Sequence, residues 1–162
     1  MASSNMDEKP LYWRIPDKQI MKQYPQMGIR ESQIWSYFLT YVPWDDILYI
    51  DYAFRVGKPY VSASHYEPSI QRMIEAVTKL RIDAVVHRVS EIWLMEVKEI
   101  ANLVALGQLL TYEHYYIKEV KPMKPVRLGV VAEDYKLNIE EVAKRYQITI
   151  FLAKPYRLEI IS

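Results

Sequence analysis

Two apolar runs separated by a short polar turn, within residues 81–100, constrain the fold of this chain more than any other part of its sequence. The first run spans residues 81–89 and the second spans residues 92–100, and β-branched residues are frequent in both. Such residues favour strands, and a tight turn at Ser90 leaves room only for a hairpin. The apolar character is nearly continuous, which indicates that both faces of the strands are covered. We therefore expect two neighbouring strands inside a sheet that is packed on both sides.

The rest of the sequence predicts helices that alternate with further strands. Apolar side chains recur at helical spacing in residues 31–41, and Asn102 is placed to cap a long helix. The expected helices are 31–41, 102–119 and 138–146 (capped by Asn138), and the further strands are 47–56, 126–132 and 147–153, with another segment at 156–161 that could add a strand. Residues 11–29 read as an irregular arm, residues 58–70 as a loop, and residues 71–81 as a short helix or the start of a long strand. The order α-β-β-β-α-β-α-β predicts an α/β fold, a mixed sheet flanked by helices.

Three polar side chains interrupt the central strands: Asp83 in the first, and Glu96 and Lys98 in the second. A two-residue turn at 89–90 would place Asp83 opposite Glu96, and a turn at 90–91 would place it opposite Lys98. Opposite residues share a face of a hairpin, and so do alternate residues along a strand. Either register therefore puts all three side chains on one face.

This grouping favours a site for a divalent cation. A buried carboxylate is costly unless it is paired or binds a metal, and two adjacent carboxylates repel each other. Oxygen ligands of this kind suit Mg²⁺ or Mn²⁺, and a neighbouring lysine can stabilise developing negative charge or orient a water molecule. The alternative is a cross-strand salt-bridge cluster on an exposed sheet face, which the flanking apolar runs disfavour.

The pattern Asp83…Glu96-Val97-Lys98 resembles the PD-(D/E)XK nuclease superfamily, with Ile82 in place of the proline. Gln108 and Tyr112 match the Q-x-x-x-Y motif of its lambda-exonuclease and RecB-like branch, and their spacing of four residues places them on one helix face. Taken alone, these two residues are equally compatible with simple core packing. In that branch, the helix before the sheet contributes a glutamate; the candidates are Glu31 first and Glu75 second.

The resemblance implies a restriction-endonuclease-like core and a Mg²⁺-dependent nuclease that hydrolyses DNA, with Mn²⁺ able to substitute. By this resemblance, Asp83 and Glu96 bind the metal together with the Val97 carbonyl, and Lys98 positions or activates the attacking water. Gln108 would hold Lys98 or a phosphate, and Tyr112 would support the helix face or the DNA backbone. The alternatives are a nuclease-fold module that binds DNA or a protein partner without cutting, and an assembly protein that uses its aromatic surface for self-association.

The basic and histidine residues give weaker signals. A phosphate groove could draw on Arg30, Arg55, Lys58, Lys79 and Arg81. The formal net charge of +1 argues against coating nucleic acid through bulk charge. The three histidines form no ligand spacing, although His87 shares a face with Asp83 in the predicted hairpin. The 14 tyrosines and 4 tryptophans fill a core more often than they bind bases.

Length and composition predict one domain over residues 11–162, preceded by a flexible tail at residues 1–10. The absence of cysteine excludes disulfides and cysteine-based metal sites. No apolar run approaches the roughly 20 residues of a membrane helix, and the N-terminus lacks the apolar segment of a signal peptide. We expect a cytoplasmic protein without a membrane partner, and homo-oligomers remain open.

Overall fold

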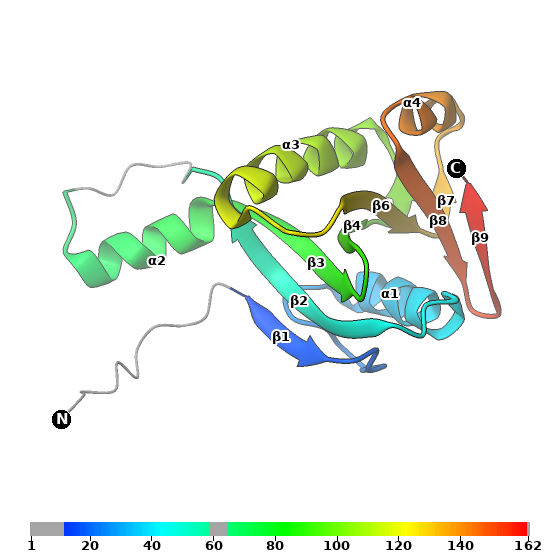
Figure 1. Cartoon of the computed structure of the whole chain (residues 1–162), viewed down its shortest axis with the longest axis horizontal. Coiled ribbons are helices and arrows are strands. Elements are labelled where there is room, and N and C mark those ends of the chain that lie inside the picture. Colours follow the sequence, from blue (N-terminus) through cyan, green and yellow to red (C-terminus); the bar gives the residue numbers. More distant parts are fainter. Residues whose placement is uncertain (1–11, 59–64, 162) are drawn as a thin grey trace.

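A seven-stranded mixed sheet forms the centre of the protein. The computed structural model describes residues 12–58 and 65–161, except for the side chains of residues 75–78. The expected tail at residues 1–10 lies outside the described residues. The strand order is β1-β2-β3-β4-β6-β8-β9 (Figure 1). The strands are β1 (Trp13–Pro16), β2 (Ile47–Val56), β3 (Leu80–Arg88), β4 (Ile92–Val97), β6 (Val126–Ala132), β8 (Ile148–Lys154) and β9 (Arg157–Ile161). β4, β6 and β8 run parallel, and the other neighbours pair antiparallel.

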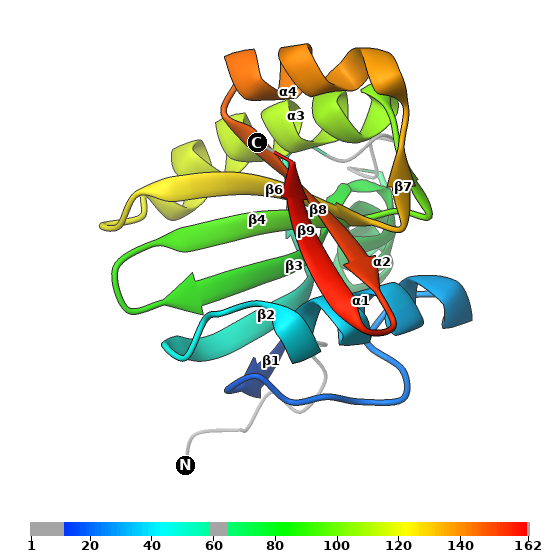
Figure 2. The same cartoon turned by 90° about the vertical axis from the view of Figure 1, so that its right-hand side faces the viewer.

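Helices cover both faces of this sheet (Figure 2). One face carries α1 (Ile29–Tyr41), and the other carries α3 (Leu103–Val120) and α4 (Glu140–Arg145), which follows the 3-10 turn η1 (Leu137–Ile139). α2 (Pro68–Thr78) stands away from the sheet at one end of the molecule (Figure 1). A small parallel pair joins β5 (Ile100–Ala101) to β7 (Asp134–Tyr135). The protein is thus α/β with a mixed sheet flanked by helices, as the sequence predicted.

Two hydrophobic cores lie on the two faces of the sheet. The α1-side core contains Trp35, Phe38 and Phe151 together with residues of β2, β3 and β4. The α3-side core contains Leu109 and Tyr116 of α3 and apolar residues of β3, β4, β6 and β8. Aromatic side chains make up much of the α1-side core, whereas other aromatic residues, such as Tyr66 and Tyr156, are exposed.

The long helix α3 forms where its sequence predicts it. Asn102 is extended and accepts a hydrogen bond from the Ala105 N–H over 3.1 Å, so it caps the first turn. The helix ends at Lys121, which adopts a left-handed conformation with φ of 52°. Its buried residues recur every three or four positions, so one stripe faces the sheet and the other face meets solvent.

A shift in side-chain alternation occurs in the middle of β2 and β3. Ile50 and Tyr52 pack in the α1-side core, whereas Val56, two further alternate positions along β2, packs in the α3-side core. Between them, Ala53 has a φ of 55°, a left-handed conformation that non-glycine residues rarely adopt. The partner strand changes in the same place, because Ala84 lies in the α1-side core and Ile82 in the α3-side core. Regular alternation therefore breaks next to Asp83.

Several expected boundaries were wrong. The arm at residues 11–29 contains the edge strand β1, and the helix in the ambiguous segment 71–81 begins earlier, at Pro68, inside the expected loop. Asn138 caps no helix, because it lies within η1 and α4 begins after it without a side-chain cap. The second central strand ends at Val97 rather than at residue 100.

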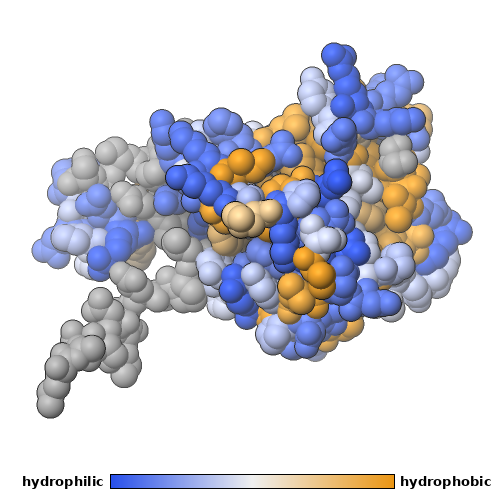
Figure 3. All heavy atoms as spheres, viewed as in Figure 1, coloured by the Kyte–Doolittle hydropathy of each residue, from blue (hydrophilic) through white to orange (hydrophobic). Residues whose placement is uncertain are grey.

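The surface seen in Figure 3 is largely hydrophilic, with separate apolar patches between the polar side chains. Among residues 12–58 and 65–161, no helix is long and apolar enough to cross a membrane.

Candidate active site

A cavity of about 390 Å³ lies at the end of the sheet where β3 begins and β4 ends. α1 and α3 both begin at this end of the sheet (Figure 2). The cavity is lined by Asp83, Glu96, Val97 and Lys98 from the central hairpin and the residue after it, by Gln108 and Tyr112 from α3, and by Glu31 from α1. The fold therefore collects these predicted side chains from three separate segments around one space.

The β3–β4 hairpin sets the relative position of the two carboxylates. Its antiparallel pairing extends to Ala84 opposite Met95. The next position on each strand places Asp83 opposite Glu96, which is the register expected for a turn at residues 89–90. Residues directly opposite in an antiparallel pair have their Cβ atoms about 4.5–5.5 Å apart. The two carboxylates consequently share one small space.

A backbone N–H group of the neighbouring strand fixes the position of the Asp83 side chain. Its Oδ2 accepts a hydrogen bond from the Val97 N–H over 2.9 Å. Burial raises the pKa of Asp83, while that hydrogen bond and the nearby charges of Arg81 and Lys98 act to lower it. The net shift of the Asp83 pKa is upward, so the folded surroundings disfavour the charged form of this carboxyl group.

Glu96 is the more deeply buried of the two carboxylates, with 4% of its surface exposed. Burial and the adjacent Asp83 raise its pKa to about 8. Oε1 lies 3.4 Å from the ammonium nitrogen of Lys98, whereas Oε2 is buried and has no hydrogen-bond partner among the described residues. A buried acceptor without a partner carries a desolvation cost, and a bound cation would remove it.

Lys98 is held in place by the sheet although it follows the last residue of β4. Its N–H donates to the Val131 carbonyl of β6 over 2.9 Å, which continues the parallel pairing by one residue. The side chain remains 29% exposed and reaches back to Glu96. One lysine therefore faces two carboxylates, and it offsets their repulsion only in part.

Gln108 and Tyr112 project from one face of α3 over the carboxylates. Tyr112 is almost fully buried, and burial together with the charge of Glu96 raises the pKa of its hydroxyl far above the ordinary range. The hydroxyl is therefore protonated, and it lies within electrostatic reach of Glu96. Gln108 Oε1 is buried and has no hydrogen-bond partner among the described residues. Tyr112 also packs in the α3-side core, whereas the unpaired amide oxygen of Gln108 lies at the cavity wall.

Glu31 lies in the first turn of α1 and folds back over Gly28, the residue that precedes the helix. A Cβ at Gly28 would lie 2.4 Å from Glu31 Oε2, so the glycine leaves the space that this carboxylate occupies. The charge of Glu31 contributes to the raised pKa of Asp83. The second glutamate considered, Glu75, has a side chain outside the described part of the structure.

The predicted basic residues divide into two groups. Lys79 and Arg81 line the cavity, and Arg55 lies directly opposite Arg81 on the neighbouring strand. Arg30 forms an ion pair with Glu133, and Lys58 is exposed and lies outside the cavity wall.

A buried cluster on β1–β3 that includes His87 was not predicted from the sequence. Asp51 is 1% exposed and binds Arg14 through two hydrogen bonds, of 2.8 and 3.1 Å, and His87 Nε2 over 3.1 Å. His87 therefore belongs to this cluster and not to the cavity wall around Asp83. The signal was present in the sequence, because Asp51 interrupts an apolar strand just as Asp83 does.

The cavity wall offers a donor set that suits one divalent cation. Asp83 and Glu96 supply carboxylate oxygens, one of them buried and unpaired, and Val97 supplies a main-chain carbonyl between Glu96 and Lys98. Among the described residues, no three histidine, aspartate or glutamate side chains are grouped closely enough to hold an ion together. Two carboxylates with a carbonyl leave the remaining positions of an octahedral Mg²⁺ shell to water or substrate.

Comparisons of this chain with protein-family models, with curated proteins and with solved structures found no match.

Proposed function

We propose that this protein is a Mg²⁺-dependent nuclease that hydrolyses phosphodiester bonds of DNA. The observation that carries the proposal is the pair of half-buried Asp83 and buried Glu96 at the wall of a cavity, with an unpaired oxygen on Glu96 and with Lys98 beside it. Such a pair is costly in the folded protein without a cation, and a phosphate group is the substrate that both a cation and a lysine can bind.

The element order supports a restriction-endonuclease-like core as part of the same proposal. α1, β2, β3, β4, α3 and β6 follow one another in the order α-β-β-β-α-β, with α2 inserted before β3. The carboxylates lie on the second and third strands of that order, and Gln108 and Tyr112 lie on the helix that follows. This matches the placement of the motifs that the resemblance implies.

Each residue has a distinct role in the proposed reaction. A divalent cation held by Asp83, Glu96 and the Val97 carbonyl would neutralise the carboxylates and polarise the scissile phosphate. Lys98, already held by Glu96, orients the attacking water and stabilises charge on the phosphoryl oxygens. The Gln108 amide contacts Lys98 or a phosphate, and the neutral Tyr112 hydroxyl holds Glu96 in position. Water adds to phosphorus and loses a proton, the bond from phosphorus to the leaving deoxyribose oxygen breaks, and that oxygen takes up a proton.

The test is cleavage of linear, circular, single-stranded and branched DNA with Mg²⁺, Mn²⁺, Ca²⁺ or EDTA. We expect cutting with Mg²⁺ and Mn²⁺, and binding with little cutting in Ca²⁺, whose looser shell fits in-line attack poorly. Asp83→Asn and Glu96→Gln should abolish cutting. Lys98→Ala should lower the rate by about 10²–10³-fold, as when one preorganised electrostatic group is removed, while DNA affinity changes much less.

Matched controls come from α4, where Glu141 and Lys144 are exposed. Glu141→Gln and Lys144→Ala should cut like the wild type. Equal cutting in EDTA, or by Asp83→Asn, would refute the proposal. If Lys98→Ala lost affinity as strongly as rate, Lys98 would be a phosphate contact only.

One observation favours a second candidate, a module of the same fold that binds DNA without cutting it. The two carboxylates that would hold the cation each already have one oxygen engaged, Asp83 by Val97 and Glu96 by Lys98, and among the described residues no group of three such side chains is close enough to hold an ion. The same experiment separates the two candidates. Tight DNA binding that neither needs a divalent cation nor leads to cutting would favour the binding module.

A further inference from the structure

Two arginines face each other across the β2–β3 pair at the edge of the cavity. Arg55 of β2 is registered directly opposite Arg81 of β3. Like charges in this position destabilise an antiparallel pair. Arg55 is also partly buried. Burial is the larger cause that lowers the pKa of Arg55, and the positive charge of Arg81 lowers this pKa further. The folded chain therefore keeps an unfavourable concentration of positive charge here.

The other partly buried arginines show how this chain usually satisfies a guanidinium group. Arg88 binds both Asp46 and Glu91, at the far end of the same hairpin. Further arginine–carboxylate pairs are Arg14–Asp51, Arg30–Glu133, Arg127–Glu91 and Arg157–Glu159. Within the described residues, neither Arg55 nor Arg81 has a carboxylate within ion-pair distance. In the described part of the chain, the cross-strand pair thus differs from Arg30 and Arg88, which are also partly buried but have a carboxylate in ion-pair contact.

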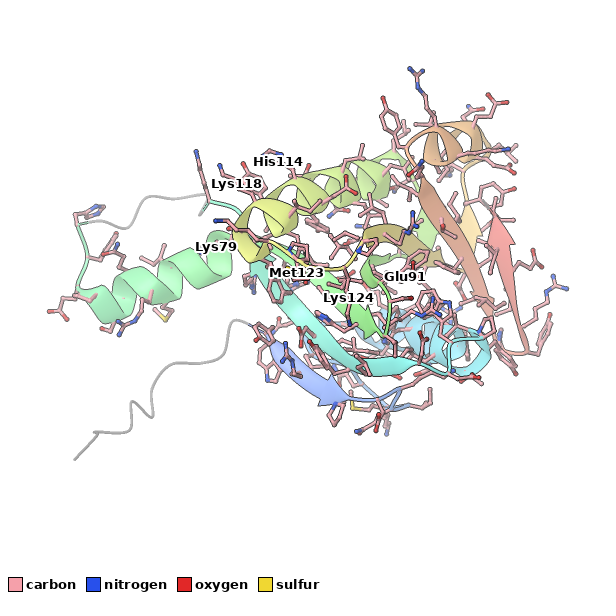
Figure 4. All side chains as sticks on the ribbon, in the orientation of Figure 1. Lys79, Glu91, His114, Lys118, Met123 and Lys124 are labelled. Atoms are coloured by element: carbon pink, nitrogen blue, oxygen red, sulfur yellow. The ribbon has the colours of Figure 1, made fainter. Side chains whose placement is uncertain are left out.

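The contacts that the two arginines do make are with neutral oxygens. Arg55 Nη1 donates to the Lys79 carbonyl over 3.4 Å, and Arg81 Nη1 donates to Gln26 Oε1 over 3.3 Å. A guanidinium group has five N–H donors, so most of them remain for a ligand. Lys79 brings a third positive charge to the same place, and Figure 4 shows it at the end of the hairpin opposite to Glu91.

Arg81 and Lys79 lie close to the carboxylates. Lys79 and Arg81 line the cavity that contains Asp83 and Glu96. The charge of Arg81 lowers the pKa of Asp83, which places the guanidinium within electrostatic reach of that carboxylate. An anion held by the arginine pair would therefore lie beside the carboxylate site.

We propose that Arg55, Arg81 and Lys79 form a phosphate-binding site at the edge of the cavity, which holds a second phosphate group of the substrate, next to the one that is cut. The identity of the substrate rests on the proposed nuclease function, whereas the binding of an anion does not. Guanidinium groups bind phosphate in a bidentate manner, so the pair recognises phosphate by geometry as well as by charge. The phosphate can be a terminal monoester or an internal diester of the same strand.

The test is binding of a labelled single-stranded oligonucleotide in EDTA, followed by fluorescence anisotropy. The oligonucleotide carries a terminal hydroxyl, a 5′-phosphate or a 3′-phosphate. The proteins are wild type, Arg55→Gln, Arg81→Gln, the double variant Arg55→Lys/Arg81→Lys, and Arg145→Gln as the control, since Arg145 is exposed on α4. Melting of each protein with and without inorganic phosphate gives a second readout that involves no DNA.

We expect each glutamine variant to weaken oligonucleotide binding by about tenfold, the loss for one charge-assisted hydrogen-bonded contact. The slope of log K against log salt should fall by about one. The double lysine variant should recover the salt slope but not the full affinity, because lysine lacks the bidentate fork. Phosphate should raise the melting temperature of wild type and Arg145→Gln more than that of the two glutamine variants.

The three oligonucleotides identify the source of the phosphate. If a terminal phosphate strengthens binding to wild type and Arg55→Gln removes that gain, the site takes a monoester end. If all three oligonucleotides bind alike and weaken alike in Arg55→Gln, it takes an internal diester. Unchanged binding and an unchanged phosphate response in both glutamine variants would overturn the proposal. Because no step requires cutting, an anion site without metal-dependent cleavage would refute the nuclease and leave this site standing.

Discussion

Glu96 combines three properties: near-complete burial, a second carboxylate close enough to raise its pKa, and an oxygen without a hydrogen-bond partner among the described residues. Its ordinary pKa of 4.5 is raised to about 8. Between these two values, the folded protein binds a proton that the unfolded chain has lost. Stability must therefore fall as the pH rises from about 4.5 to about 8, and the full penalty is present above pH 8.

Glu96→Gln should therefore stabilise the metal-free protein. The neutral amide removes the charge that burial disfavours, and since Lys98 already offsets part of that cost, the gain should be on the order of 1 kcal/mol above pH 8. The gain should shrink as the pH falls towards 4.5. Urea unfolding in EDTA across this pH range measures it, with Glu141→Gln as the control. Added Mg²⁺ should stabilise the wild type and not the variant.

The salt-bridge interpretation of the same residues predicts the opposite sign. If Glu96 served mainly to neutralise Lys98, the substitution would strand a partly buried ammonium group and lower the stability. A destabilised Glu96→Gln protein, together with a wild type that does not respond to Mg²⁺, would support that structural role.

One residue of β2 with an unusual backbone conformation changes which faces of the β2–β3 pair the neighbouring side chains occupy, next to the site. Ala53 has a φ of 55°, and the side-chain alternation shifts there on both strands. The shift lies beside Asp83 and just before the registered pair Arg55 and Arg81. An L-residue pays about 1–2 kcal/mol for this conformation, so the rest of the sheet must impose it.

Ala53→Gly should therefore leave the stability unchanged or raise it by up to about 1 kcal/mol. Glycine removes the steric strain at positive φ, and its larger loss of backbone entropy on folding, about 0.5–1 kcal/mol, offsets part of that gain. Ala84→Gly is the matched control, since Ala84 is buried on the adjacent strand and has no positive φ. That control should destabilise. Equal losses for the two variants in urea unfolding would show that Ala53 is not strained.

For the whole molecule, the decisive feature is that two cores share a single sheet. The α1-side core and the α3-side core are both built on β3, β4, β6 and β8. Loss of packing on either face should loosen strands that the other face needs. The described part of the chain should therefore unfold as one cooperative unit.

Leu109→Ala, in the α3-side core, tests this coupling from a distance. The leucine is fully buried, and its truncation should cost about 2–5 kcal/mol. Trp35 and Trp44 lie in the α1-side core, so their fluorescence reports on the opposite face. We expect the fluorescence and circular dichroism midpoints in urea to fall together, as they should for Leu39→Ala on the α1 side. Separate transitions would show that the two faces unfold independently.

Local sequence signals predicted the elements whose stability is local. The helical spacing of residues 31–41, the Asn102 cap of α3 and the apolar run of β6 all correspond to observed elements. β1 has only four residues, and most of them are exposed, so its own sequence contains no strand signal. Pairing with β2 makes this segment a strand. Asn138 was expected to cap α4, but a 3-10 turn occupies that position because the chain there continues directly from β7.

The sequence by itself determined the hairpin and its contents, because a strand alternates with period two and a two-residue turn at 89–90 sets which residues are opposite. Asp83 facing Glu96, with Lys98 one alternate position further, follows from those local rules. Only the tertiary structure decided which distant groups join them. Four features depend on contacts with other parts of the fold: the shift at Ala53, the position of Glu31 over Gly28, the pairing of Arg55 with Arg81, and the contact of His87 with Asp51. Such contacts arise from packing two helical layers on one twisted sheet, and local periodicity carries no information about them.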